Sequence, residues 1–589
     1  MTGRMVIQDI RPRTPSRRSA KAVVGERVRV TAAMFKDGHD PLSGRVLLCA
    51  DGDEKPEELA DLRFLGNDEW EAYVVPQRVG PHYIVVQGWS TKEPVERPED
   101  ASDLTSSPRQ ALWVDRPRAL VGAWYELFPR SFGGFKGTCA RVADVAEMGF
   151  DVLYLPPIHP IGVTARKGPN NALEAGPDDP GSPWAIGNRD GGHTAINPDL
   201  GTVDDFVALV EEVDRCGMEV ALDYALQCSP DHPWVTEHPE WFHHRADGTI
   251  ACAENPPKIY QDIFPLNFWP PSEADRVAMW NACRGIIDHW ISLGVRIFRV
   301  DNPHTKPIAF WEWLIAGVQA QHPDVLFLAE AFTRPKVMAR LAEAGFTQSY
   351  TYFTWRVEQH GPDGLWAYLD ELAHGPTADY MRPSFWPNTP DILSGPLRYG
   401  PPAAFALRLV LAATMSPSYG VYSGYELFEN LPASELNEEY LHSEKYEIKH
   451  RDYGRPGTLA PLMTALNEIR RRHPALHRLR TIEFHPSNNP QIIAYTKQSD
   501  DGEDAVLMVV NLDPHGVQEA ILDLNLDALD LPTDEPYDVV DELSGEHYTW
   551  NGAHPYVRLA PDESVAHLLD LHPDGRGAEP GGGQVPGGG

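Results

Sequence analysis

The chain has 589 residues, 42% of them hydrophobic and 23% charged, so it is long enough to fold into several globular domains. Its formal net charge of −34 disfavours nucleic acids and anionic membrane surfaces as partners. The basic N-terminus has no apolar run of signal-peptide length, and no later stretch is long enough to span a membrane. We therefore expect a cytoplasmic protein.

The six cysteines give no sign of a disulfide framework. No two of them form a CxxC pair, and none has histidines nearby at the spacing of metal ligands. We expect reduced thiols that lie mostly in the core. The cysteines are Cys49, Cys139, Cys216, Cys228, Cys252 and Cys283.

The first part of the chain has the pattern of an all-β domain. Residues 24–118 contain short alternating runs separated by turn residues, which predicts an antiparallel β-sandwich. Residues 1–23 are expected to form a flexible N-terminus. Residues 91–107, rich in Glu, Pro, Asp and Ser, have no hydrophobic period and are expected to be a connector.

Residues 119–478 alternate between β-like runs and helical patterns, which is typical of βα units with a parallel sheet. One helix is signalled by Thr202 as its N-cap and Asp205 three residues later. Eight runs predict an α/β fold, a (β/α)8 TIM barrel, with inserted loops at about 159–193 and 226–268. The runs begin at Gly122, Asp151, Glu219, Val295, Val325, Phe346, Ser384 and Gly420.

The C-terminal part returns to alternating runs. Residues 479–573 therefore predict a second antiparallel β-sandwich. Residues 574–589 are rich in Gly and Pro, have nothing to bury, and are expected to be a disordered tail. The barrel is thus expected between an N-terminal and a C-terminal β-sandwich domain.

Carboxylates close several of the predicted barrel strands. Asp223 ends the third strand, Asp301 the fourth and Glu330 the fifth, and the seventh leads into Asp391. A carboxylate at the end of a hydrophobic strand is costly to bury unless it is paired or functional. One alone would indicate a cap or a buried ion pair, but several at the C-terminal mouth of one barrel predict an active site.

Two carboxyl groups that flank one bond are the minimum for retaining glycosyl transfer, because one attacks the anomeric carbon while the other exchanges protons with the leaving and attacking oxygens. Arg299 and Asp301 alternate on one strand, so both side chains point into the barrel mouth. The guanidinium can orient the carboxylate and keep it ionised. A purely structural ion pair is the alternative interpretation of Arg299, and both roles can hold together.

The order of Arg299, Asp301, Glu330 and Asp391 along a barrel flanked by β-sandwiches resembles the α-amylase superfamily, glycoside hydrolase family 13. Longer stretches, within about residues 120–571, are similar to one member, the α-1,4-glucan:maltose-1-phosphate maltosyltransferase family. These stretches are Tyr125-Glu-Leu-Phe-Pro-Arg-Ser, Leu155-Pro-Pro-Ile-His-Pro-Ile-Gly, Gly181-Ser-Pro-Trp-Ala-Ile-Gly, Ala253-Glu-Asn-Pro-Pro-Lys-Ile-Tyr, Asp301-Asn-Pro-His-Thr-Lys-Pro and Ser443-Glu-Lys-Tyr-Glu.

The resemblance implies a role for each member of the carboxylate triad. Asp301 matches the nucleophile and Glu330 the general acid/base of the family. Asp391 matches the third carboxylate, which holds sugar hydroxyls and stabilises the transition state. The implied reaction moves maltosyl units from α-maltose 1-phosphate to the non-reducing end of an α-1,4-glucan, through a covalent β-maltosyl-aspartate, with release of inorganic phosphate.

Two departures from the general amylase pattern fit the maltosyltransferase family. Gln227 and Cys228 stand where amylases usually place Asn and His, and Pro390 rather than a histidine precedes Asp391. The first departure removes the usual calcium-linked asparagine, so we expect no metal. No cofactor is expected either, and Gln227 becomes a candidate sugar contact.

A phosphate dianion has to enter a protein with a net charge of −34, so local donors must offset that field. The resemblance implies that Asn255, Lys258, Tyr260 and Asn302 bind the phosphate through two amides, an ammonium and a phenol. The alternative interpretation of this segment is a turn at Asn255 with a solvated Lys258.

Further side chains are candidates for substrate binding. Lys167 and Asn171 match a family segment near the donor sugars, and Trp184 is either a stacking platform or a core residue. His304 and Lys306 follow the nucleophile closely and are either substrate contacts or structural partners. The aromatic candidates for acceptor subsites are Tyr352, Phe353 and Trp355.

Assembly and reaction type keep alternatives open. The family's helical insertion, used in dimerisation, has only the short connector at residues 91–107 in its place, which weighs against a homodimer of the family type. The expected partners are α-maltose 1-phosphate and α-1,4-glucan acceptors. An α-glucan hydrolase or isomerase on the same barrel is the alternative function. A non-catalytic glucan-binding scaffold is disfavoured because all three carboxylates are present.

Overall fold

The computed structural model describes residues 4–91, 98–255, 258–356, 364–435 and 437–572. They belong to two compact units. The first unit spans Met1–Trp355, His374–Tyr399 and Ser418–Thr458, and the second spans Arg356–Ala373, Gly400–Pro417 and Leu459–Gly589. None of the helices described by the structure combines the length and hydrophobicity needed to traverse a lipid bilayer.

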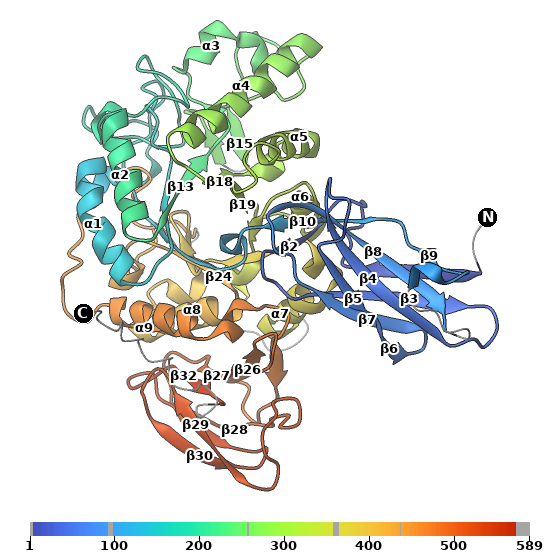
Figure 1. The fold of residues 1–589 in the computed structure, drawn as a ribbon. Helices are drawn as coiled ribbons and strands as arrows, with labels where there is room; N and C mark the ends of the chain where they lie inside the picture. The colour runs from blue at the N-terminus through green and yellow to red at the C-terminus, as the bar shows by residue number, and fades with distance from the viewer. Residues whose placement is uncertain (1–3, 92–97, 256–257, 357–363, 436, 573–589) are drawn as a thin grey trace, which may run out of the picture. The chain divides into compact units, whose positions relative to one another are not determined.

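The N-terminal part of the first unit is a β-sandwich of two sheets (Figure 1). Its strands are β1 (Met5–Arg11), β2 (Ala20–Val23), β3 (Val28–Lys36), β4 (Leu42–Ala50), β5 (Glu58–Asp61), β6 (Arg63–Gly66), β7 (Glu69–Val74), β8 (Gly80–Ser90), β9 (Thr105–Ser106) and β10 (Gln110–Asp115). One sheet has the order β1-β3-β7-β6, and the other has β2-β10-β8-β4-β5 with β9 beside β8. Buried side chains such as Val30 and Val86 form one core between them.

The prediction of a flexible N-terminus at residues 1–23 is wrong for most of its length. β1 pairs with β3, and β2 pairs in parallel with β10, so the sandwich is not purely antiparallel. All four residues of β2 are buried. The sequence signal for these strands is weak, because β1 (Met-Val-Ile-Gln-Asp-Ile-Arg) does not alternate regularly, β2 has only four residues, and basic residues lie between them. In the predicted connector, β9 pairs with β8, and residues 92–97 lie outside the described residues.

The predicted (β/α)8 barrel is confirmed. Its strands are β11 (Gly122–Glu126), β12 (Val152–Leu155), β13 (Glu219–Tyr224), β18 (Ile297–Asp301), β19 (Leu326–Glu330), β20 (Gln348–Tyr350), β21 (Pro383–Phe385) and β24 (Ser418–Tyr422). They close into a barrel in chain order, and every neighbouring pair is parallel. Each of the eight predicted runs overlaps one of these strands.

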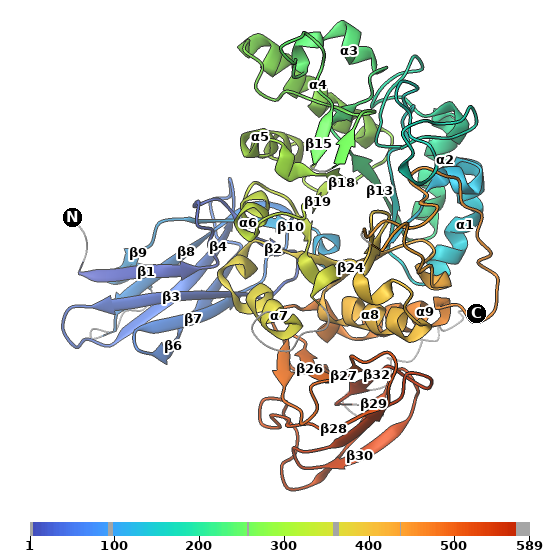
Figure 2. The ribbon, with the colours of Figure 1, turned by 180° about the vertical axis from the view of Figure 1, so that it is seen from behind.

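Helices of the first unit surround the barrel strands (Figures 1 and 2). They include α1 (Phe135–Glu147), α2 (Val203–Arg215), α4 (Glu273–Ser292), α5 (Ile308–Gln319) and α6 (Pro335–Glu343). The predicted start of α2 is confirmed, because the Thr202 hydroxyl accepts from the Asp205 backbone N–H at 3.2 Å while Asp205 accepts from the Thr202 backbone N–H. The helix buries Phe206, Leu209 and Val213.

The two long loops carry little regular structure of their own. The loop after β12 contains isolated bridges and short 3₁₀ turns, among them Pro169–Asn171. The loop after β13 contains β14 (Gln227–Cys228), α3 (Pro233–Glu237), β15 (Ala253–Asn255), β16 (Lys258–Tyr260) and β17 (Phe264–Pro265). β14 pairs with β17 and β15 with β16. These loops follow strand ends, where a barrel builds its active site.

Aromatic side chains fill the barrel interior. Trp386 stacks on Tyr350 with ring centroids 4.9 Å apart, and its other contacts are edge-on to Trp124 and Tyr154. All four are buried members of one core cluster. These rings fill the barrel interior, so the barrel has no open channel. Polar side chains at the C-terminal ends of the strands therefore face the loops.

The second unit has its own β-rich core. Its six-stranded sheet has the order β25-β26-β27-β32-β29-β30, and β28 pairs with β31. The strands are β25 (Glu483–His485), β26 (Ile492–Gln498), β27 (Ala505–Asn511), β28 (Gln518–Ile521), β29 (Pro536–Asp541), β30 (His547–Asn551), β31 (Tyr556–Leu559) and β32 (Ala566–Asp570). The unit also contains α8 (Pro402–Met415) and α9 (Ala460–Arg472). The predicted tail at residues 574–589 lies outside the described residues.

Candidate active site

A cavity of about 560 Å³ opens at the C-terminal ends of the barrel strands and is walled by the two long loops. It is large enough for a small-molecule substrate. The predicted site residues that line it are Lys167, Asn171, Trp184, Gln227, Tyr260, Asp301, Asn302, His304, Lys306, Glu330 and Asp391.

Two carboxylates stand next to each other at the floor of the cavity. Asp301 is the last residue of β18 and Glu330 is the last residue of β19, and the parallel register pairs them directly. Since neighbouring strands lie about 4.8 Å apart, the two side chains start from adjacent points. Nη1 of Arg299 lies 3.0 Å from Oδ1 of Asp301, and Nη2 lies 3.3 Å from Oε1 of Glu330. One guanidinium therefore contacts both carboxylates.

Asp223, itself bound by Tyr154, holds Arg299 in position. Nη1 donates to Oδ2 of Asp223 at 2.8 Å, and the same oxygen accepts from the Tyr154 hydroxyl at 2.5 Å. Burial alone would lower the pKa of Arg299. The negative charges of Asp223 and Glu330 outweigh this effect, so the pKa is raised well above its usual value. Burial raises the pKa of Asp223 to about 7 in spite of the neighbouring guanidinium. Arg299 therefore keeps its charge and its place.

Glu330 has the protonation state of a general acid. Burial raises its pKa to about 8; Arg299 lowers it, while Asp301 and Asp391 raise it further. The backbone N–H of Asn302 donates to Oε2 of Glu330 at 3.2 Å. At neutral pH the carboxyl group is mostly protonated and can donate a proton to a leaving oxygen.

The third predicted carboxylate has a cationic partner. Asp391 lies between β22 (Asn388–Thr389) and β23 (Ile392–Leu393) and forms an ion pair with Lys445. Burial alone would lower the pKa of Lys445, but the charge of Asp391 outweighs it and raises the pKa. The Nζ atom of Lys445 lies 5.5 Å from the centroid of the Trp184 ring. This part of the cavity therefore offers a carboxylate, an ammonium and an aromatic face together.

Trp184 lines the cavity although only 6% of its surface is exposed. Gln227 donates from Nε2 to the carbonyl of Trp184 at 3.3 Å. Lys167 donates to Oε1 of Gln261 at 2.6 Å. These three side chains come from the two long loops and meet at one wall of the cavity.

Lys306 contacts the backbone at the C-terminal end of β18. Its Nζ donates to the carbonyls of Asp301 and Asn302 at 3.1 and 3.2 Å. Its side chain also lines the cavity, so a structural contact and a cavity-facing position coexist. The predicted aromatic residues after the sixth strand are not among the cavity-lining residues that the structure describes; Phe353, for example, stacks on Phe385 at 4.4 Å.

The predicted phosphate segment is only partly described. Tyr260 and Asn302 line the cavity. Asn255 and Lys258 are paired across β15 and β16, and their side chains lie outside the described part of the structure.

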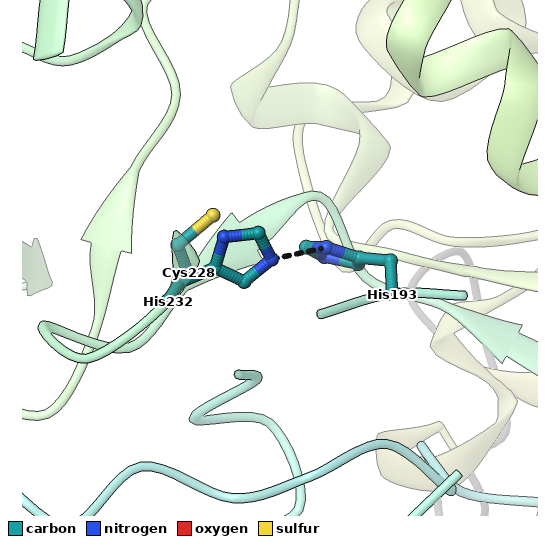
Figure 3. Close-up of side chains that lie close together, drawn as sticks. All are labelled: His193, Cys228 and His232. Atoms are coloured by element: carbon teal, nitrogen blue, oxygen red, sulfur yellow. Dashed lines mark hydrogen bonds between the residues drawn. The ribbon is translucent and has the colours of Figure 1, made fainter. Parts of the chain in front are cut away.

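Three side chains beside the cavity wall lie close enough together to be considered as metal ligands. His193, Cys228 and His232 are buried, and one ligand atom from each lies within 4.8 Å of the others. Figure 3 shows the two imidazoles facing each other, with the sulfur at the far side of the His232 ring. Nδ1 of His193 lies 3.1 Å from Nε2 of His232, so a hydrogen bond already joins the rings. Cys228 and His232 lie four residues apart in the loop after β13, and only folding brings His193 to them from the loop after β12.

Comparison with known proteins gives matches over almost the entire length. Residues 3–95 match a family model described as "Alpha-1,4-glucan:maltose-1-phosphate maltosyltransferase, domain N/S", and residues 484–571 match one described as "GLGE, C-terminal". Alpha-1,4-glucan:maltose-1-phosphate maltosyltransferase 2 of Streptomyces coelicolor is 46% identical, with 98% of each chain covered. The chain belongs to the α-1,4-glucan:maltose-1-phosphate maltosyltransferase family.

Another member of the maltosyltransferase family is also similar over most of this chain. The enzyme of Mycolicibacterium smegmatis is 52% identical over 80% of this chain and 68% of its own. The alignment with the Streptomyces coelicolor protein runs over 664 positions, more than the 589 residues of this chain, so that relative contains segments that this chain lacks.

Solved structures share the fold of this maltosyltransferase-family chain. A cyclomaltodextrinase covers 96% of this chain and 99% of its own with a TM-score of 0.61 at 16% identity. An α-amylase from Lactobacillus plantarum covers 77% of this chain and 100% of its own with a TM-score of 0.57 at 20% identity. These likenesses place the barrel in the α-amylase fold.

Sequence reasoning missed several cavity residues of this maltosyltransferase-family chain. Lys445 and Tyr446 line the cavity and lie in the motif that begins at Ser443, which by itself indicates the family but no role for these side chains. Asp262 also lines the cavity and is 2% exposed, and its Oδ1 has no hydrogen-bond partner among the residues that the structure describes. No local pattern distinguishes Asp262 from other aspartates, since only the fold brings it to the wall.

Proposed function

We propose that the cavity transfers maltosyl units from α-maltose 1-phosphate to the 4-hydroxyl at the non-reducing end of an α-1,4-glucan and releases inorganic phosphate. The names of the relatives support the donor and the acceptor. The observation that carries the chemistry is the direct register pairing of Asp301 with Glu330. Retaining enzymes keep their two carboxyl groups about 5 to 5.5 Å apart, which suits side chains on adjacent strands.

In the first step, a carboxylate oxygen of Asp301 attacks the anomeric carbon and the bond from that carbon to the phosphate oxygen breaks. Glu330 gives its proton to the departing oxygen. The product is a β-maltosyl ester on Asp301. Arg299, at 3.0 Å from Oδ1 of Asp301, supports this step because its guanidinium orients the attacking carboxylate.

In the second step, Glu330 acts as a base. It takes the proton from the acceptor 4-hydroxyl while that oxygen attacks the anomeric carbon, and the bond to Asp301 breaks. Two inversions leave an α-1,4 linkage. The same groups are then restored to their starting protonation states.

The phosphate of the donor needs positive partners in an acidic protein. Tyr260 and Asn302 at the cavity wall supply a hydroxyl and an amide, and Asn255 and Lys258 are the further phosphate-binding candidates. The sugar has its candidates on the other wall, where the ion pair of Asp391 with Lys445 can hold hydroxyl groups.

An assay with α-maltose 1-phosphate and maltohexaose, following phosphate and product masses together, tests this function. Products that lengthen by two hexose units, with one phosphate per step, are expected. Phosphate with free maltose and no longer products would indicate the alternative α-glucan hydrolase. Absence of turnover by the folded protein would overturn the proposed donor.

A further inference from the structure

A buried histidine pair joins the two long loops that wall the cavity. His193 belongs to the loop after β12 and is 3% exposed, while His232 belongs to the loop after β13 and is 2% exposed. Nδ1 of His193 and Nε2 of His232 are 3.1 Å apart (Figure 3). Neither residue lines the cavity or has a role in the proposed chemistry.

The surrounding backbone determines where the ring protons lie. The Trp234 N–H donates to Nδ1 of His232 at 3.0 Å, so this nitrogen carries no proton. The proton of neutral His232 is then on Nε2 and donates to Nδ1 of His193. The proton of His193 is consequently on Nε2, which lies 2.9 Å from the carbonyl oxygen of Ala225. Three hydrogen bonds run in one direction and use all four ring nitrogens.

The neutral state of both rings agrees with their burial. Burial lowers the pKa of His193 to about 4 and that of His232 to about 2. A metal ion on Nε2 of His232 would move the ring proton to Nδ1, where it would face the Trp234 N–H. The hydrogen bonds therefore favour a link between loops over a metal site.

The first loop closes around the His232 ring. A Cβ atom placed on Gly187 would lie 2.3 Å from Cδ2 of His232, and one placed on Gly192 would lie 2.3 Å from Nε2. Only glycine lets the backbone approach this closely. The His232 ring is thus held between Gly187 and Gly192 of the loop after β12, and His193 directly follows Gly192 in the sequence.

The same two loops carry cavity side chains. Trp184 lies three residues before Gly187, and Gln227 lies five residues before His232. Gln227 donates to the carbonyl of Trp184 at 3.3 Å, and the Ser229 N–H donates to the carbonyl of Ile186 at 2.7 Å. A shift of one loop against the other would therefore displace both Trp184 and Gln227.

We propose that His232, acting through His193, is a positioning residue that locks the two loops together and so holds Trp184 and Gln227 in place for the donor sugar. The donor part of this statement rests on the proposed function, whereas the locking of the loops does not. The part of the cavity wall formed by Trp184 and Gln227 contacts a glucosyl unit of the donor, because indole and amide groups bind pyranose rings.

Two substitutions of His232 separate its two hydrogen bonds. In His232→Asn, the amide oxygen can still accept from the Trp234 N–H, but the donor to His193 is lost. In His232→Gln, the longer amide can reach His193 as a donor, while the acceptor for Trp234 is lost. If the hydrogen bond from His232 to His193 is what joins the loops, His232→Gln retains more donor-dependent activity than His232→Asn. If only the acceptor at the start of α3 matters, the order is reversed.

Hydrogen exchange of the ligand-free protein tests the lock without reference to any substrate. His232→Asn is expected to increase exchange in residues 184–193 and 227–234, with His232→Gln closer to the native protein. Unchanged exchange in both variants would overturn the lock. Should His232→Asn fail to fold, Ser229→Ala serves instead, because it removes the bond from Oγ to the Gly187 carbonyl in the same contact.

Steady-state kinetics with α-maltose 1-phosphate test the consequence for the donor. His232→Asn is expected to raise the donor KM about tenfold, the effect of one lost hydrogen bond, with much less change in kcat. Loosened loops with an unchanged donor KM would overturn the positioning role. Failure of the native enzyme to use this donor would instead contradict the proposed function and leave the exchange result standing.

Metal analysis separates the lock from a metal site. The purified protein is expected to hold no stoichiometric zinc, and Cys228→Ser is expected to leave the donor KM unchanged because the thiol is outside the hydrogen-bond chain. One equivalent of zinc that is lost together with loop protection in Cys228→Ser would overturn the proposal.

Discussion

Asp301 and Glu330 are register partners at the ends of adjacent parallel strands, β18 and β19. Arg299 reaches both from one guanidinium, at 3.0 Å from Asp301 and 3.3 Å from Glu330. Burial raises the pKa of Glu330 to about 8. In the proposed mechanism these neighbours have different roles, Glu330 as the acid and Asp301 as the nucleophile.

Trapping of the covalent intermediate follows from this difference. Glu330→Gln removes the base needed for the second step, whereas phosphate can leave with less help in the first. After mixing with α-maltose 1-phosphate, we expect this variant to gain the mass of one maltosyl unit, located on Asp301 by peptide mapping. The double variant with Asp301→Asn is the matched control and should gain no mass. A maltosyl group on another residue would contradict the assignment of the nucleophile.

The need for a protonated Glu330 predicts a loss of activity at high pH. Glu330 must be protonated in the first step, and its pKa is raised to about 8, chiefly by burial. Its protonated fraction is high below that pH and is lost as the pH rises through it, so kcat/KM for the donor should fall above about pH 8. α-Maltose 1-phosphate suits this measurement from about pH 7.5 upward, because its phosphate has a second pKa of about 6 and stays a dianion over that range. A flat profile up to pH 10 would count against Glu330 as the acid.

Removal of the partner of Asp391 should weaken donor binding. Lys445→Met leaves the carboxylate without its ammonium in a cavity that already contains Asp301 and Glu330. We expect kcat/KM for α-maltose 1-phosphate to fall by about 30-fold or more, the usual effect of breaking a partly buried charge pair. Lys449→Met is the matched control, since Lys449 pairs with Glu429 at 3.0 Å and does not line the cavity. Equal losses in both variants would indicate a structural effect.

A second buried ion pair should govern stability instead of activity. Nη1 of Arg382 lies 2.6 Å from Oδ2 of Asp115, whose side chain is 1% exposed. Asp115→Ala leaves the guanidinium buried without its anion, so we expect a loss of about 3 kcal/mol in urea unfolding. Asp37→Ala, which removes the exposed partner of Arg4, should have no measurable effect. Similar midpoints for both variants would show that the buried pair contributes little.

Much of the fold was predictable from the sequence because it depends on local patterns. The eight strands of the barrel were visible as apolar runs between helical segments, and the start of α2 was visible from Thr202 and Asp205. β1 and β2 were missed because their apolar signal is short, and their pairing with β3 and β10 is what stabilises them.

For the site, the sequence by itself determined the family and the order of Asp301, Glu330 and Asp391 along the chain, since strand-end motifs are contiguous. The tertiary structure alone decided which groups meet: Lys445 with Asp391, and His232 with His193. Such pairs come from separate loops, and no local pattern records a contact made by folding. The raised pKa of Glu330 likewise depends on burial and on surrounding charges, which only a folded chain supplies.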